Sequence, residues 1–137
     1  MTVEWTDLIQ AARNARDNAY CPYSGYSVGA AVGNGDGEVF TGVNVENISY
    51  GATICAERSA IVAMVATGSK KLTRIAVATS DGGPPCGMCL QVMAEFADPN
   101  LEIALIDRDG VVKTHHLRDF LPLRFESAEV KRKDEAS

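Results

Sequence analysis

The sequence predicts a three-layer αβα sandwich, an α/β fold in which a five-stranded mixed sheet lies between helices. Segments with helical spacing alternate with short segments rich in β-branched residues, in the order α-β-β-α-β-α-β-β-α. Helices that separate strands favour parallel crossovers and cover both faces of a sheet. The turn sequence Asn34-Gly35-Asp36-Gly37 predicts an antiparallel hairpin, so the sheet must be mixed.

The first part of the chain predicts one helix followed by this hairpin. Residues 4–19 carry apolar side chains at helical spacing, and the helix ends before Pro22 and Gly25. Val28–Val32 is typical of a buried strand, and Glu38–Val45 is expected to be its hairpin partner.

The remaining elements alternate between helix and strand. A helix is expected over Cys55–Thr67, closed by Gly68, and another from Cys86 to Phe96, after the break at Gly82-Gly83-Pro84-Pro85. Three strands and a short last helix are expected at Thr73–Thr79, Leu101–Ile106, Val111–Thr114 and Leu117–Leu121. We expect residues 1–125 to form a single domain and residues 126–137 to be a charged, disordered tail.

Composition excludes several classes of function. The 137 residues carry a net charge of −5, and the basic run 131–133 is followed at once by two acidic residues, so long nucleic acid is not expected as a partner. No apolar run approaches the roughly 20 residues of a membrane span, so no membrane association is expected. The first ten residues lack the pattern of a secretory signal, and a cytoplasmic location is expected.

Three of the four cysteines fall into two motifs at predicted helix starts. Cys86 and Cys89 form a C-x-x-C, which alone also fits a thioredoxin-like redox pair or half of a structural zinc site. Cys55 begins the preceding predicted helix. Helix N-termini favour thiolates, and three thiolates brought together suit zinc.

The number of ligands separates structural from catalytic zinc sites. Structural sites are closed by four protein ligands, whereas catalytic sites keep one position for water. Cys21, His115 and His116 are the available fourth ligands, so the cysteines alone leave both kinds of site open. We expect the two histidines at the surface and Cys21 as a buried thiol in a loop.

Glu57 favours the catalytic alternative. It lies two residues after Cys55, where an acid is also favoured simply by the helix dipole. However, Cys-x-Glu combined with Pro-Cys-x-x-Cys is the arrangement of zinc deaminases, in which the glutamate moves protons. Arg58 could offset the negative charge of three thiolates by hydrogen bonding to a ligand sulfur, although an exposed helical arginine is the ordinary alternative.

With these motifs, the chain resembles the small, homotetrameric, zinc-dependent cytidine deaminases, which act on cytidine and deoxycytidine. The resemblance extends from about Tyr20 to Phe125. The segments that carry it are Cys55-Ala56-Glu57-Arg58, Pro85-Cys86-Gly87-Met88-Cys89, Pro22-Tyr23-Ser24, Val28-Gly29-Ala30-Ala31, Asn44-Val45-Glu46-Asn47 and Leu121-Pro122-Leu123-Arg124-Phe125.

The resemblance implies the cofactor, the reaction and the assembly. One zinc ion per chain would be held by Cys55, Cys86 and Cys89. Zinc-bound hydroxide would attack C4 of free cytidine or 2′-deoxycytidine while Glu57 shuttles protons, which yields uridine or 2′-deoxyuridine and ammonia. The expected role is pyrimidine salvage by a cytoplasmic homotetramer whose active sites form at subunit contacts.

The resemblance also implies a set of nucleoside-binding residues. Asn44 and Glu46 match residues that hold the ribose 3′-hydroxyl, and positions two apart on a strand point to the same face. Tyr26 matches an aromatic residue, often phenylalanine, that lies against the base. Phe125 matches an aromatic supplied to a neighbour's pocket, and backbone groups near Ala56 and Cys86 are expected to read the pyrimidine edge.

Two features of the metal motifs bear on charge. Arg58 matches the arginine that contacts the zinc-bound thiolates in the family. Leu90 follows Cys89 where the family usually has arginine, a departure that puts local ion pairing and thiolate tuning in doubt but does not remove a zinc ligand.

Other readings remain open at the level of the sequence. A deaminase of cytosine-containing antibiotics of the blasticidin type would use the same metal site, although Asn44 and Glu46 favour a ribose. Deaminases of deoxycytidylate or polynucleotides usually have histidine in place of Cys55. A thioredoxin-like reductase would leave Cys55 and Glu57 unused, and a zinc-stabilised binding module would need a fourth ligand.

Overall fold

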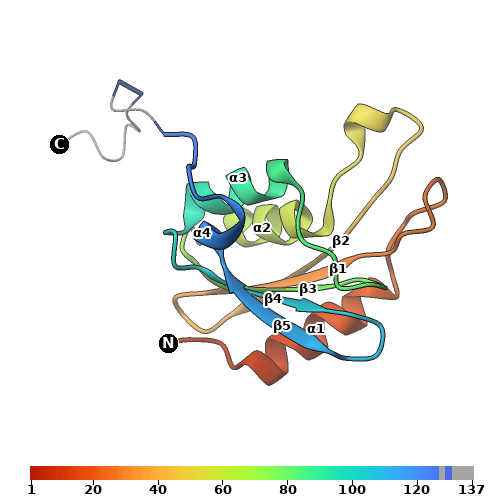
Figure 1. The fold of residues 1–137 in the computed structure, drawn as a ribbon, viewed down its shortest axis with the longest axis horizontal. Helices are drawn as coiled ribbons and strands as arrows, with labels where there is room; N and C mark the ends of the chain where they lie inside the picture. The colour runs from red at the N-terminus through yellow and green to blue at the C-terminus, as the bar shows by residue number, and fades with distance from the viewer. Residues whose placement is uncertain (127–128, 131–137) are drawn as a thin grey trace.

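The computed structural model describes residues 1–126 and 129–130 and contains a five-stranded sheet between helices (Figure 1). The strands are β1 (Gly29–Asn34), β2 (Val39–Val43), β3 (Leu72–Ala78), β4 (Glu102–Ile106) and β5 (Val112–His116). The α-helices are α1 (Trp5–Arg16), α2 (Ala56–Ala66), α3 (Gly87–Phe96) and α4 (Leu117–Phe120), and a 3-10 helix, η1, spans Tyr50–Ala52.

The sheet is mixed, as the sequence predicts. Its strand order is β2-β1-β3-β4-β5. Only the β3–β4 pair is parallel, because α3 provides the crossover between these strands, and the other neighbouring pairs are antiparallel. In Figure 1, α1 lies on one face of the sheet and α2 and α3 lie on the other, so the three-layer αβα architecture is confirmed.

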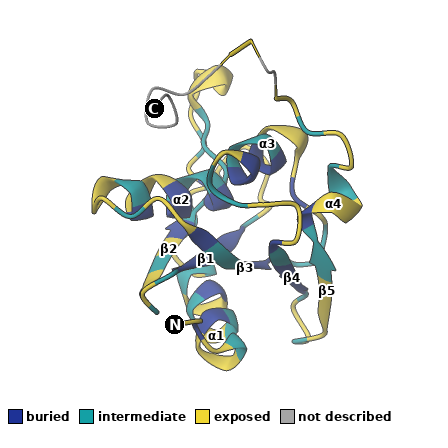
Figure 2. Cartoon of the chain, turned by 90° about the vertical axis from the view of Figure 1, so that its left-hand side faces the viewer, coloured by how far each residue is buried: buried dark blue, intermediate teal, exposed yellow. Residues whose placement is uncertain are grey.

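Side-chain size differs between the two faces of the central strands. Toward α2 and α3, β3 presents Ile75 and Val77, which belong to the larger core cluster. Toward α1, the same strand presents Ala76 and Ala78, which belong to a smaller cluster. Helix α1 therefore packs close to the sheet over small residues, and the inward sides of all three helices are buried (Figure 2).

Helix α2 lies directly on β2 because Gly42 has no side chain. A Cβ atom at this position would lie 2.3 Å from the backbone nitrogen of Ala60 and 2.5 Å from the carbonyl oxygen of Ala56. This close approach sets the position of the first turn of α2 relative to the sheet. At its other end α2 is followed by Gly68, whose φ of +92° is a conformation that favours glycine.

One strand ends earlier than its pattern predicts. The segment Glu38–Val45 was expected to be extended throughout, but β2 ends at Val43. The reason is the side chain of Asn44, which bonds to the backbone of Val28 and of Tyr26 and replaces part of the strand ladder. Val45 continues only as isolated bridges to Tyr20 and Ile54.

The disordered tail expected over residues 126–137 lies almost wholly outside the described residues. Within residues 1–126 and 129–130, no helix combines the length and apolar character of a membrane span.

Candidate metal centre and active site

The sulfur atoms of the three motif cysteines form one cluster, in which all lie within 4.8 Å of one another. The Sγ atom of Cys86 is 3.4 Å from that of Cys89 and 3.9 Å from that of Cys55. Ligands of a tetrahedral zinc ion with Zn–S bonds of about 2.3 Å stand roughly 3.8 Å apart. The cluster therefore fits zinc in both donor type and spacing, as the sequence predicts.

Two helix N-termini bring these thiols together. Cys55 is the N-cap residue of α2 and Cys86 is the N-cap residue of α3, both with extended backbone, and Cys89 lies in the first turn of α3. The free N–H groups and positive dipole ends of both helices stabilise thiolates there. Cys89 is buried, Cys55 is half-buried and Cys86 is exposed, so solvent reaches the cluster on the side of Cys86.

Hydrogen bonding within the cluster stabilises negative charge on sulfur. The pKa of Cys55 is lowered to about 5, mainly by a hydrogen bond from Cys89. Hydrogen bonds from Arg58 and Cys86 make smaller contributions in the same direction. The same bond with Cys55 raises the pKa of Cys89, so the proton between these two groups resides on Cys89. Zinc displaces thiol protons when it binds.

Arg58 is directed at the cluster rather than at solvent. Its Nη2 atom lies 3.6 Å from the Sγ atom of Cys55. Its Nε atom is buried and has no hydrogen-bond partner among the described residues. The guanidinium group thus lies next to the Cys55 thiol, and the residue is half-buried rather than exposed.

Glu57 is held in a water-poor environment beside the thiols. Its side chain is only 5% exposed, in the first turn of α2. Burial raises the pKa of Glu57 to about 7. A carboxyl group with such a pKa can take up and release a proton near neutral pH, which is the property that general acid–base catalysis requires.

The alternative zinc ligands lie elsewhere. His115 packs against the ring of Phe120, with centroids 5.0 Å apart. His116 is the N-cap residue of α4, and its backbone N–H donates to Asp119. Both histidines are partly exposed at the surface, as expected, whereas Cys21 is half-buried rather than buried. Within the described part of the chain, the metal-binding cluster consists of the three cysteines.

Asn44 and Glu46 do not share the face of a strand, because β2 ends before them. Asn44 is buried, accepts a hydrogen bond from the backbone nitrogen of Val28 and donates one to the carbonyl oxygen of Tyr26. One amide hydrogen and one lone pair of its side chain remain for other partners.

The carboxylate of the half-buried Glu46 is fixed by three donors. The backbone nitrogens of Tyr23 and Ser24 lie 2.9 and 3.1 Å from its Oε1 atom, and the Ser24 hydroxyl donates to Oε2. The hydrogen bond from the Ser24 hydroxyl is the main cause of the lowered pKa of Glu46, so the group stays charged. It is therefore an oriented acceptor that faces solvent.

Two aromatic side chains differ in their surroundings. Burial is the main cause of the raised pKa of Tyr26, and the charges of Asp81 and, to a smaller extent, Glu57 raise it further. The ring of Phe125 is 76% exposed. Gln91 of α3 holds the Phe125 backbone with two hydrogen bonds of 3.2 Å, one to its carbonyl oxygen and one from its nitrogen.

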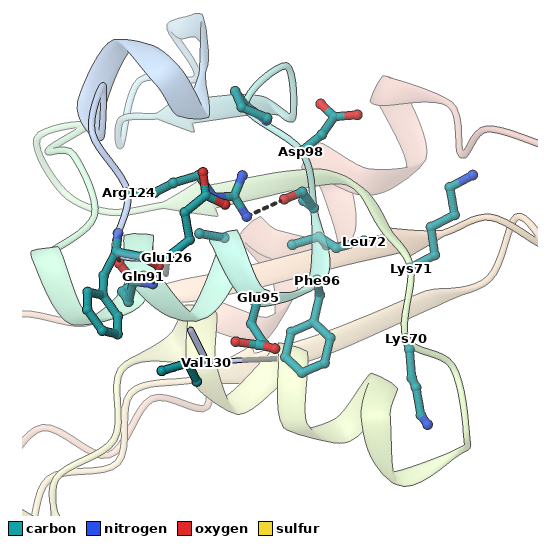
Figure 3. A pocket seen from close by; sticks show the side chains of 14 residues that line it. Lys70, Lys71, Leu72, Gln91, Glu95, Phe96, Asp98, Arg124, Glu126 and Val130 are labelled. Atoms are coloured by element: carbon teal, nitrogen blue, oxygen red, sulfur yellow. Dashed lines mark hydrogen bonds between the residues drawn. The ribbon is translucent and has the colours of Figure 1, made fainter. Parts of the chain in front are cut away.

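Phe125 also lines a groove of about 690 Å³ between α3 and the start of β3 (Figure 3). Gln91, Arg124 and Glu126 lie at one end of this groove, and Lys70 and Lys71 lie at the other. The Arg124 guanidinium donates to the carbonyl oxygen of Ala97 at 2.9 Å. None of the cluster cysteines lines the groove, so it is separate from the metal centre.

The sequence assigned no role to three polar residues that support these positions: Ser24, Asp81 and Gln91. Each forms hydrogen bonds with a residue far away in the chain, as in the pairs Ser24–Glu46 and Tyr26–Asp81. The only local signal is the run Asp81-Gly82-Gly83, which indicates a turn but not the partner of its aspartate.

Comparison with known proteins agrees with this geometry. Residues 4–105 match the family model described as the cytidine and deoxycytidylate deaminase zinc-binding region. The chain is 42% identical to a cytidine deaminase of Halalkalibacterium halodurans over 120 residues, which cover 86% of this chain and 91% of the relative. It is 42% identical over 125 residues to a cytidine deaminase of Mycobacterium tuberculosis, with 90% of each chain covered.

Solved structures agree as well. The crystal structure of a cytidine deaminase from Burkholderia pseudomallei has a TM-score of 0.85 and 43% sequence identity, and the match covers 90% of this chain and 100% of that one. The three-thiol cluster, its zinc-like spacing and these relatives lead to one conclusion. The chain belongs to the family of zinc-dependent cytidine deaminases.

Proposed function

We propose that this cytidine deaminase hydrolyses free cytidine and 2′-deoxycytidine to uridine and 2′-deoxyuridine, with release of ammonia. The observation that carries the proposal is the buried carboxyl group of Glu57 beside a three-thiol cluster that solvent reaches on one side. Cys55, Cys86 and Cys89 would hold the zinc ion, which would supply Lewis acidity for the activation of water near neutral pH.

Glu57 is the proposed proton carrier. It accepts a proton from the attacking water and delivers it to N3 of the pyrimidine, which allows C4 to accept the new C–O bond. It then takes the remaining proton from the new hydroxyl on C4 and transfers it to the amino group, so that the C–N bond breaks, ammonia leaves and the C4 carbonyl of the product forms. Its burial supports this role, because a group shielded from bulk water exchanges protons with substrate rather than with solvent.

The other residues are proposed to bind the nucleoside or to tune the metal site. Glu46 accepts a hydrogen bond from the ribose 3′-hydroxyl, and Asn44 uses its remaining amide hydrogen for the same group. Tyr26 lies against the base, and backbone groups near Ala56 read the pyrimidine edge. Arg58 offsets the charge of the thiolates, a role supported by its hydrogen bond to Cys55.

We also propose a homotetramer in which Phe125 completes the pocket of a neighbouring subunit. The exposed ring of Phe125, on a backbone anchored to α3, supports this arrangement. Sedimentation should show a tetramer at assay concentration, and an active monomer would contradict the shared pocket. A cytoplasmic location and a role in pyrimidine salvage belong to the same proposal, since three neighbouring free thiols suit a reducing compartment.

One combined experiment tests the proposed reaction. Purified chain is analysed for zinc and incubated with cytidine and with 2′-deoxycytidine, and ammonia and the deaminated nucleoside are quantified. We expect about one zinc per chain. We also expect one ammonia to be released for each uridine or 2′-deoxyuridine that forms. Zinc bound by four protein ligands would favour a structural site, and disulfide reduction without ammonia release would favour a reductase.

A further inference from the structure

The hydroxyl group of Tyr26 has a partner that base stacking does not explain. The side chain is 38% exposed, so packing alone restrains the ring only partly. Its hydroxyl donates a 2.7 Å hydrogen bond to Oδ1 of Asp81, which lies 55 residues further along the chain. Asp81 follows β3 in the loop that leads to the zinc ligand Cys86.

Asp81 is itself held in place by the loop that carries it. Its Oδ1 atom also accepts hydrogen bonds from the backbone nitrogen of Gly83 at 3.0 Å and from the hydroxyl of Thr79 at 3.3 Å. The hydrogen bond from Tyr26 is the main cause of the lowered pKa of Asp81. Tyr26 therefore donates to a charged and fixed acceptor, which gives a stronger hydrogen bond than a neutral one.

The surrounding backbone is shaped to admit the hydroxyl. A Cβ atom at Gly83 would lie 3.1 Å from the Tyr26 hydroxyl oxygen, so a larger residue would crowd this contact. The Tyr26 backbone is fixed as well, because its N–H donates to Ser24 and its carbonyl accepts from Asn44. The residue is thus held at its N–H, its carbonyl and its hydroxyl.

We propose that Asp81 is a positioning residue for nucleoside binding, which fixes the Tyr26 ring in its stacking orientation before the substrate arrives. This inference rests on the proposed function, in which Tyr26 contacts the base. A ring immobilised in advance loses less conformational freedom on binding. Asp81 should therefore act on the affinity for nucleosides and leave the chemical step, which depends on Glu57, unchanged.

A double-mutant cycle tests the proposal. The kcat and KM for cytidine and the Kd for uridine, measured by calorimetry, are compared in the parent, Tyr26→Phe, Asp81→Ala and the double variant. Each single variant should raise KM and Kd about 3- to 10-fold, the range of one net hydrogen bond, with kcat within about twofold of the parent. The KM and Kd of the double variant should be no higher than those of the weaker-binding single variant, because the two substitutions remove the same interaction.

Two further variants separate positioning from general damage. Asp81→Asn retains an acceptor oxygen and should recover most of the binding. Tyr20→Phe makes the same chemical change at a hydroxyl without a hydrogen bond to any described residue, and should bind like the parent. Zinc content should stay at the parental level throughout, since Thr79 still accepts the Gly83 N–H at 3.2 Å when Asp81 is replaced.

The outcomes are distinct. Unchanged binding in Asp81→Ala, multiplicative effects in the double variant, or a loss confined to kcat would overturn the proposal while leaving cytidine deamination intact. A parent chain that neither releases ammonia from cytidine nor binds uridine would overturn the proposed function together with this inference.

Discussion

The residues assigned to the chemistry and those assigned to nucleoside binding differ in what holds them. Cys55 and Glu57 lie at the start of α2, which is pressed against β2 at Gly42 and packed into the core. Tyr26 and Glu46 lie in loops outside the regular strands and are held by individual hydrogen bonds. The residues proposed for the chemistry are therefore positioned by packing, whereas those proposed for nucleoside binding are positioned by polar contacts in loops.

The largest effect should come from Glu57→Gln, which removes the proton carrier and keeps its shape. Turnover of cytidine should fall by about 10⁴-fold or more, because one carboxylate is proposed to serve several proton transfers. Zinc content and uridine affinity should stay near the parental values, since the thiols and the ribose contacts are unchanged. Steady-state kinetics with metal analysis checks this. A variant that keeps zinc and more than about a tenth of the turnover would remove Glu57 from the mechanism.

Glu46→Gln should produce a smaller effect that is confined to recognition. Loss of a charged acceptor should weaken binding of ribonucleosides by about 1.5–3 kcal/mol, whereas free cytosine, which lacks the sugar, should bind as it does to the parent. Inhibition constants for uridine and for free pyrimidine bases measure the difference. Equal losses for both would show that Glu46 does not contact the ribose.

Gly42→Ala tests whether the close packing of α2 on β2 stabilises the fold. The added methyl group meets the backbone of α2, so the free energy of unfolding should fall by about 1–3 kcal/mol. Gly51→Ala is the matched control, because a Cβ atom there meets nothing within 4 Å. Chemical denaturation of both variants at one protein concentration makes the comparison. Equal stabilities would mean that the α2–β2 contact does not fix the helix.

Ser24→Ala should have the smallest effect, on the pH dependence of binding. The Ser24 hydroxyl is the main cause of the lowered pKa of Glu46, so its removal returns that pKa toward its ordinary value of 4.5. The parental carboxylate keeps its charge, and its ribose contact, to lower pH than the variant does. Binding of uridine should therefore weaken at a higher pH in Ser24→Ala as the solution is acidified. Coincident pH profiles would contradict this role for Ser24.

The features that the sequence predicts are those set by local patterns, and the features that it misses are contacts between distant segments. The helices and strands follow from apolar periodicity and turn residues, and the three-cysteine cluster follows from two short motifs at helix starts. The early end of β2 could not be predicted, because it depends on the Asn44 side chain competing for the backbone of Val28. The partners Asp81 and Gln91 were missed because they join segments distant in sequence, and no local pattern marks such pairs.

The anchoring of Phe125 has a consequence for redesign. Gln91 binds only the main-chain nitrogen and carbonyl of residue 125, so the path of this segment does not depend on the side chain that it carries. Every amino acid except proline offers the same two groups. The side chain at position 125 can therefore be varied in a library while the backbone of this residue stays bound to Gln91 of α3.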